Sequence, residues 1–219
     1  MPIECEGIVL RQTKILKGRR MIVLLTEKNG KLSCGTNISE RSKSKSALAI
    51  RPFTLGSYNI SLVKKDKKNY YNIKSAEVVK PYYSFGDDYE RFTGASLALE
   101  FTDRLLIEEA EVPEIYRLLN TYMDLMAIRK KAYKTLTVSY FIKLLQNAGV
   151  FPEPENFTAD SLLSALDSDI IKKLVFIMEN PLIRMETLAM DEISENRLQR
   201  LVLQYAEKHL DISSLKSDI

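Results

Sequence analysis

The hydrophobic pattern of the chain changes its period near Pro81, and this change constrains the fold more than any other feature of the sequence. Before Pro81, short runs rich in β-branched and aromatic residues are separated by polar and turn-forming residues, as in strands. After it, apolar residues recur at spacings of three and four, as on one face of a helix. The sequence therefore predicts an α+β protein in which a β domain over residues 1–80 precedes an α-helical domain over residues 81–219.

Five runs in the first 80 residues have the composition of strands. They cover residues 8–10, 20–26, 31–36, 53–63 and 70–79. Asn29-Gly30 separates the second run from the third, and this dipeptide favours a hairpin closed by a type I′ turn. Five strands in a short segment fit a small barrel, and the OB-fold is a five-stranded barrel that often binds nucleic acid. We expect an N-terminal OB-fold β-barrel.

The segment after Pro81 is expected to form an α-helical bundle. Its apolar spacing predicts six helices, and the stretch over residues 180–191 is expected to be irregular. Pro113 is acceptable in a first helical turn, and Gly149 is suited to end a helix. The helices are expected over residues 87–110, 113–126, 136–148, 161–166, 169–179 and 194–209.

Charge is distributed very unevenly along the chain. Residues 1–80 hold 17 Lys and Arg but six Asp and Glu, whereas residues 81–219 hold 15 and 23. The first segment therefore carries +11 and the second −8, although the whole chain carries only +3. Such asymmetry indicates a basic module that meets a polyanion, joined to an acidic module that does not.

Three basic clusters of the first segment are candidates for contact with phosphate groups. They lie before the second predicted strand, in the polar stretch over residues 39–46, and between the last two strands. If short strands bring them to one rim, that rim binds nucleic acid with steep salt dependence and little sequence preference. A merely solvated surface is the alternative, but three clusters in one small domain favour nucleic acid. The predicted contacts are Arg19, Arg20, Arg41, Lys43, Lys45, Lys65 and Lys68.

Three tyrosines of the predicted strands, Tyr58, Tyr70 and Tyr71, offer rings that can stack on bases. Aromatic residues in strands more often pack against neighbouring side chains. We therefore expect packing to be their main role.

The sequence offers no set of residues for catalysis or for a metal centre. One histidine and two cysteines, Cys5 and Cys34, exclude metal sites built on several imidazoles or four thiolates, and no phosphate-binding P-loop motif occurs. Glu100, Asp103 and Glu108 have a spacing that allows a two-metal nuclease site, but they lie in the acidic segment, away from the basic one that would hold a substrate. We expect a protein that is not an enzyme, has no cofactor or bound metal, does not span a membrane, and resides in a reducing cytoplasm.

A basic patch interrupts the acidic segment and has two interpretations that the residues leave open. A groove with a basic rim and aromatic floor would capture an acidic peptide with a hydrophobic end. Alternatively, the cations offset the dipole of a helix C-terminus. The predicted docking residues are Arg129, Lys130, Lys134, Tyr140 and Lys143.

The order of these segments resembles that of the RecO family of bacterial recombination mediators. Each motif is weak alone, and only their order along nearly the whole chain is specific. The resemblance is carried by residues 7–11, the hairpin over 24–31, Lys43-Ser44-Lys45 before residues 52–55, the helix and Gly-x-x-Pro turn over 141–152, and Leu215-Lys216-Ser217.

The resemblance implies an OB-fold that binds single- and double-stranded DNA, followed by a helical domain. It also implies strand annealing, cooperation with RecR, and help in loading RecA onto DNA coated by single-strand-binding protein. The acidic C-terminal tail of that protein is expected to dock on the helical domain. A cytoplasmic, nucleoid-associated location follows from the same resemblance.

The chain departs from the family pattern in two places. Residues 38–40 read Ile-Ser-Glu where family members usually carry Gly-x-Arg, which predicts weaker DNA contact in that loop. Many members carry a four-cysteine zinc site after the Gly-x-x-Pro turn, whereas residues 153–190 contain no cysteine. An RNA-binding OB-fold protein with a helical adaptor, and a protein–protein adaptor with a basic surface, remain the alternative functions.

Overall fold

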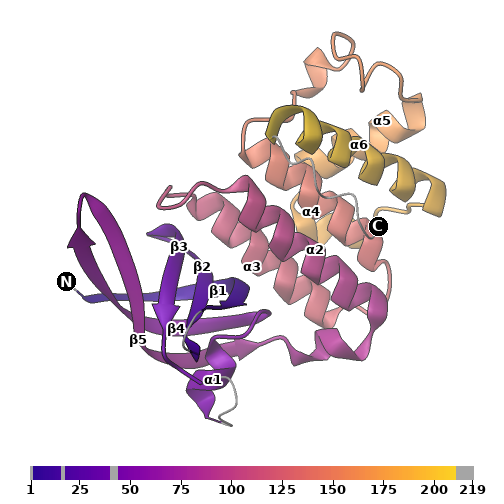
Figure 1. Ribbon diagram of the computed structural model, residues 1–219. Helices are drawn as coiled ribbons and strands as arrows, with labels where there is room; N and C mark the ends of the chain where they lie inside the picture. The colour runs from indigo at the N-terminus through magenta and orange to yellow at the C-terminus, as the bar shows by residue number, and fades with distance from the viewer. Residues whose placement is uncertain (1, 16–17, 40–43, 211–219) are drawn as a thin grey trace. The chain divides into compact units, whose positions relative to one another are not determined.

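The computed structural model of the protein describes residues 2–15, 18–39 and 44–210 (Figure 1). The chain divides into two compact units, residues 1–120 and 121–219. The first unit contains all five strands together with the helix that follows them, so its limit lies beyond the change of period at Pro81. The domain boundary expected at residue 80 stays a prediction.

A closed barrel of five strands occupies the start of the first unit, as predicted (Figure 1). The strands follow one another around the barrel in the order β1-β2-β3-β5-β4. Neighbours are antiparallel except β3 and β5, which pair in parallel through only two residue pairs, Cys34 with Tyr71 and Gly35 with Asn72. The strands are β1 (Pro2–Lys14), β2 (Arg20–Thr26), β3 (Gly30–Thr36), β4 (Thr54–Lys65) and β5 (Lys68–Pro81).

Alternate side chains of these strands form the core of the barrel, and a short helix joins it. Val9, Ile22 and Ile60 are fully buried, as the period of two requires. Helix α1 (Lys45–Ala49) lies between β3 and β4 in the chain, and its Ala49 is part of the same core. The hydroxyl of Tyr58 donates to the Ala49 carbonyl oxygen at 2.6 Å, which satisfies a buried polar group and fixes the helix.

The turns of the β2–β3 and β4–β5 hairpins differ from the turn that the sequence suggests. At the β2–β3 hairpin, Thr26 pairs with Gly30 across a three-residue loop, and φ is positive at Gly30 but not at Asn29. The hairpin is confirmed there, but the predicted type I′ turn is wrong. Positive φ at two consecutive residues occurs instead at Asp66 and Lys67, between β4 and β5, where the sequence contains no glycine.

Helix α2 (Tyr89–Leu105) ends five residues before the predicted limit at residue 110. The segment that follows, residues 106–111, runs beside β3, and we call it the acidic strap because it carries three glutamates. Glu109 N–H donates to the Lys31 carbonyl oxygen at 2.9 Å. A β-carbon on Gly30 would lie 1.9 Å from the Ala110 carbonyl oxygen, so this close approach requires glycine. Pairing with β3 therefore replaces the last helical turns.

The helices after α2 carry the rest of the chain. Helix α4 packs against α5 and α6 in the second unit. The predicted helix over residues 161–166 is wrong, because a single i to i+4 hydrogen bond, from Ser164 N–H to the Asp160 carbonyl oxygen, does not nucleate a helix. No described helix has the length and apolarity of a membrane span. The remaining elements are η2 (Tyr83–Asp87), α3 (Pro113–Ile128), α4 (Tyr133–Asn147), η3 (Pro154–Asn156), α5 (Ser168–Glu179), η4 (Leu182–Glu186) and α6 (Glu192–Leu210).

Candidate nucleic-acid interface

A basic groove opens on the barrel where β3 and β5 meet. Arg19 precedes β2, and its Nη2 donates to Asn72 Oδ1 on β5 at 3.2 Å. The groove has a volume of about 630 Å³. Among the described residues, its lining contains two cations and no carboxylate, which suits a polyanion. The lining residues are Arg19, Gly35, Thr36, Asn37, Ile38, Asn72, Ile73 and Lys74.

Gly35 allows the two sides of this groove to approach each other. A β-carbon there would lie 3.0 Å from Asn72 Oδ1 and 3.2 Å from Arg19 Nη2. The glycine therefore lets the guanidinium lie across β3, where Asn72 orients it. A guanidinium held in this way presents its planar donors to phosphate oxygens, and the Lys74 ammonium adds a second positive charge.

The basic residues at the start of β2 belong to this groove or lie beside it. Arg20 pairs with Lys14 of β1 and with Thr36 of β3, so it lies at the same end of the barrel as Arg19. Loops that precede β2 and that connect β4 to β5 are the usual ligand-binding loops of OB-folds. The first of these loops thus supplies Arg19 and Arg20 in this chain.

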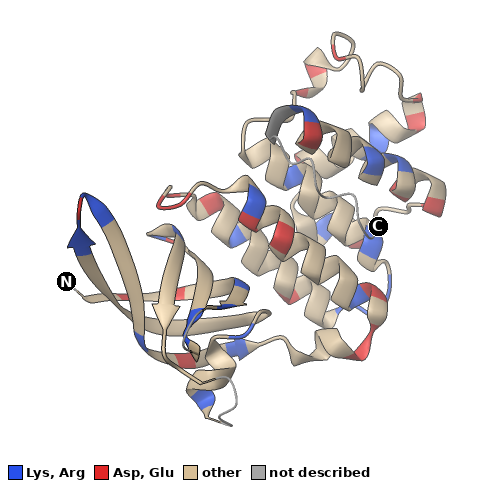
Figure 2. Cartoon of the chain, viewed as in Figure 1, with Lys and Arg blue, Asp and Glu red and all other residues tan. Residues whose placement is uncertain are grey.

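Lys65 and Lys68 lie elsewhere, at the turn between β4 and β5. Both are exposed, and Figure 2 shows the positive charges of the two arms near that turn. Lys68 is four residues from Asn72 along β5, about 13 Å at the usual rise of a strand. Lys65 and Lys68 therefore do not line the groove, and the expectation that they share one rim with the Arg19 cluster stays a prediction.

The third predicted cluster is described only in part. Lys45 is the first residue of α1 and is exposed. Arg41 and Lys43 lie outside the described residues. The side chain of Ser44 accepts a hydrogen bond from Ala47 N–H and caps the helix, so this serine has a structural role.

Three residues that lie in the groove or beside the predicted contacts were not predicted from the sequence. Asn72 and Lys74 line the groove, and Lys67 lies within the β4–β5 turn. The signal for the first two was their alternation with buried Ile73, because residues two apart on a strand share a face. Among the tyrosines, packing is confirmed for Tyr58, which is 2% exposed.

The expected peptide groove on the helical segment is wrong in two of its residues. Tyr140 is fully buried against Tyr122, with ring centroids 4.5 Å apart, so its ring belongs to the core. Arg129 is also buried; its Nη1 donates to the Ala132 carbonyl oxygen at 3.3 Å, and burial lowers its pKa. A helical stripe of aromatic and basic residues does not reveal from sequence which of its members point inward.

The lysines of this patch differ in their surroundings. Lys143 is half-buried and donates to the Met178 carbonyl oxygen at 3.2 Å, and burial lowers its pKa. Lys134 donates to Asn196 Oδ1 at 2.6 Å, whereas Lys130 is exposed.

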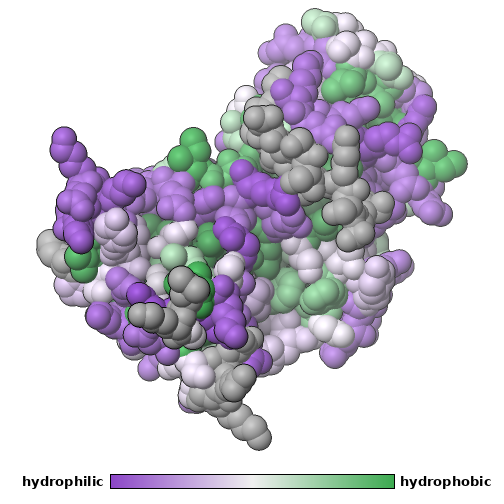
Figure 3. Space-filling view, in the orientation of Figure 1, coloured by the Kyte–Doolittle hydropathy of each residue, from purple (hydrophilic) through white to green (hydrophobic). Residues whose placement is uncertain are grey.

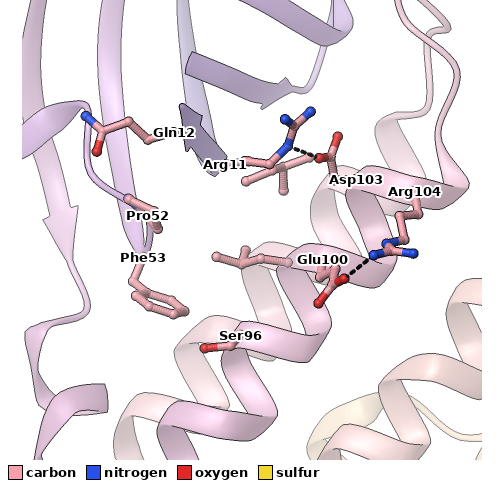
Figure 4. A pocket seen from close by; sticks show the side chains of 10 residues that line it. Arg11, Gln12, Pro52, Phe53, Ser96, Glu100, Asp103 and Arg104 are labelled. Atoms are coloured by element: carbon pink, nitrogen blue, oxygen red, sulfur yellow. Dashed lines mark hydrogen bonds and ion pairs between the residues drawn. The ribbon is translucent and has the colours of Figure 1, made fainter. Parts of the chain in front are cut away.

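A second hollow, of ≈ 610 Å³, lies between the barrel and α2 within the first unit (Figure 4). Asp103 Oδ2 accepts from Arg11 Nε at 2.7 Å, and Glu100 Oε1 accepts from Arg104 Nη2 at 2.6 Å. Glu108, the third acid of the nuclease hypothesis, instead bonds Ser33. Among the residues that the structure describes, no three potential metal ligands gather. Asp103 and Glu108 therefore hold α2 and the strap on the barrel, whereas the ion pair of Glu100 lies within α2.

A closed five-stranded barrel with a basic groove, followed by helices, defines the class of OB-fold proteins with a helical C-terminal region. The family model described as "Recombination protein O N terminal" matches residues 1–82, and "Recombination protein O C terminal" matches residues 86–156. The chain belongs to the RecO family, and this membership gives it a role in DNA repair and recombination.

Individual relatives agree with the family models. A DNA repair protein RecO of Caldanaerobacter subterraneus is 22% identical over 241 residues, covering 99% of this chain and 96% of the relative. One from a Thermoanaerobacter species is 22% identical over 243 residues with the same coverage. Another, from a Nocardioides species, is 31% identical over 163 residues, or 73% of this chain and 65% of that protein.

Proposed function

We propose that the chain is a non-enzymatic recombination mediator that binds DNA through its barrel by electrostatic contact rather than base readout. In this proposal, residues 1–80 hold single- and double-stranded DNA, and residues 81–219 hold partner proteins. The observation that carries it is the groove at Arg19 and Lys74, which joins two cations to amide and hydroxyl donors without any carboxylate in its lining. Contacts of this kind position a phosphate backbone but carry no sequence information.

The first test is binding of labelled single-stranded oligonucleotides, followed by fluorescence anisotropy over a series of salt concentrations. The logarithm of the binding constant is expected to fall linearly with the logarithm of salt concentration, alike for different sequences. Arg19→Gln with Lys74→Gln is expected to lower the slope by about 1.4, since each phosphate contact to a single strand contributes about 0.7. Lys172→Gln with Lys208→Gln removes the same charge from exposed helical positions and is the matched control.

Binding that is absent, or that does not respond to salt, would refute the proposal and favour a protein–protein adaptor. A matched RNA oligonucleotide that competes better than DNA would favour the RNA-binding alternative. DNA that is cut when magnesium is added would show that the protein is an enzyme.

The mediator activities extend the same proposal. Holding two strands by their phosphates lets complementary bases find each other, so the chain is expected to accelerate annealing. It acts with RecR to help load RecA, within the bacterial nucleoid. The acidic tail of single-strand-binding protein docks on the helical segment near exposed Lys130. Binding of a labelled tail peptide, weakened by Lys130→Glu but not by Lys172→Glu, tests this contact.

A further inference from the structure

The β4–β5 hairpin continues beyond the barrel as a two-stranded ribbon (Figure 1). The pairing of β4 with β1 ends at Ser61, and β5 pairs with β3 only at Tyr71 and Asn72. From Val63 to Tyr70, the strands of the ribbon pair only with each other among the described residues. The end of this ribbon is hydrophilic in the space-filling view (Figure 3).

Two features at the end of the ribbon lower its stability. Lys65 pairs directly with Lys68, and like charges directly opposite each other destabilise a sheet. The turn between them places Asp66 at φ 53° and Lys67 at φ 62°, a conformation that favours glycine or asparagine. Strained backbone that keeps a charged side chain in place is a feature of binding sites. An anion beside the lysines would relieve their repulsion.

The two faces of the ribbon have different surroundings. Side chains alternate between faces, so Asn69 and Tyr71 share one face. The acidic strap lies on that face, where Asn69 Nδ2 donates to Glu109 Oε2 at 2.9 Å. Burial and the Glu109 carboxylate raise the pKa of Tyr71. The opposite face carries the exposed pairs Lys65–Lys68 and Val63–Tyr70.

The strap also bonds both β3 and the ribbon. Glu108 bonds Ser33 on β3, and Glu109 bonds Asn69 on β5. Along β3 and β5, both contacts lie on the side of the groove residues Gly35 and Asn72 that is nearer to the β4–β5 turn. A phosphate backbone that ran from the groove to the turn would pass Glu108 beside Ser33. It would follow the face of β5 opposite to Glu109, since Asn72 alternates with Tyr71 and Asn69.

We infer that the ribbon is a second DNA site, independent of the groove, which takes duplex DNA by entering its major groove while the Arg19–Lys74 groove takes a single strand. The inference rests on the proposed function, and it assigns single-stranded DNA to the groove and duplex DNA to the ribbon. A two-stranded ribbon fits the major groove, which is about 12 Å wide. Lys65, Lys67 and Lys68 then contact phosphates of the duplex.

The test compares a ribbon variant, Lys65→Gln with Lys68→Gln, with the groove variant Arg19→Gln with Lys74→Gln. Binding of a single strand and of a duplex of equal length is measured by anisotropy across salt concentrations. The ribbon variant is expected to lower the duplex salt slope by about 1.8, since each contact contributes about 0.9. Its affinity for the single strand is expected to change less than about twofold, and the groove variant should show the reverse. Lys172→Gln with Lys208→Gln is the control.

Three outcomes overturn the inference. A ribbon variant that weakens both DNAs equally would mean one continuous site, and unchanged duplex binding would mean that the ribbon takes no duplex. Parent protein that binds neither DNA would refute the proposed function itself, which distinguishes the two failures. Because the substitutions remove a like-charge pair, the unfolding temperature is expected to stay level or rise, so lost duplex binding is not lost folding.

Discussion

Gly30→Ala tests whether the acidic strap is fastened to β3 as the structure shows. The added methyl group would lie 1.9 Å from the Ala110 carbonyl oxygen, so the strap has to move away from the strand. Alanine must also adopt φ +63°, which costs roughly 1–2 kcal/mol. Moving the strap removes the hydrogen bond from Glu109 N–H to Lys31, worth about 0.5–1.5 kcal/mol. The free energy of unfolding is therefore expected to fall by about 1.5–3.5 kcal/mol.

Gly149→Ala is the matched control for this substitution. Gly149 also has positive φ, +69°, but its missing β-carbon would meet no atom within 4 Å. This variant isolates the conformational cost and is expected to lose only that cost, roughly 1–2 kcal/mol. Unfolding in urea, followed by circular dichroism, gives both changes in the free energy of unfolding. If Gly30→Ala is no more destabilising than Gly149→Ala, the close packing of the strap on β3 is not present in solution.

Two further predictions concern titratable groups. A hydrogen bond from Ile170 N–H and the charge of Arg197 lower the pKa of Asp167 from its usual 3.8. The ionised carboxylate therefore stabilises the fold above about pH 4, and this stabilisation is lost as the pH falls through the lowered pKa. The difference in unfolding temperature between parent and Asp167→Asn is therefore expected to be constant from pH 5 to 7 and to shrink below pH 4; a constant difference throughout would refute it. Burial raises the pKa of Cys34 to about 12 and of Cys5 to about 11, so at pH 8 a thiol reagent is expected to react slowly until denaturant is added; rapid reaction of native Cys34 would contradict this.

The strands were predictable because their signal is local. Alternation and β-branched composition are read from a few neighbouring residues, and they identified all five strands of the barrel. The turns were less predictable, because tertiary contacts select the turn conformation. Gly30 has positive φ and lies against Ala110, and no local pattern announces that neighbour. The early end of α2 has the same cause, since β3 offers the strap hydrogen bonds that compete with the helix.

The candidate site was predictable in its composition but not in its arrangement. Clusters of lysine and arginine are visible in any sequence, and Arg19 and Lys65 are both basic residues near strand ends. Whether such clusters meet depends on the parallel register of β3 with β5, a pairing of residues 37 positions apart such as Cys34 with Tyr71. Lys74 joins the groove through that register alone.

The charge of +11 on residues 1–80 overstates the surface that is available to DNA. Acids from beyond residue 80 neutralise part of it, since Asp103 bonds both Arg11 and Lys31. These contacts concentrate negative charge where α2 and the strap cover the barrel, and phosphate is disfavoured there. As far as the structure describes them, the groove lining and the outer face of the ribbon contain no such acid. In the proposed function, the acidic residues that fasten the helix thereby also determine which parts of the basic segment are available to DNA.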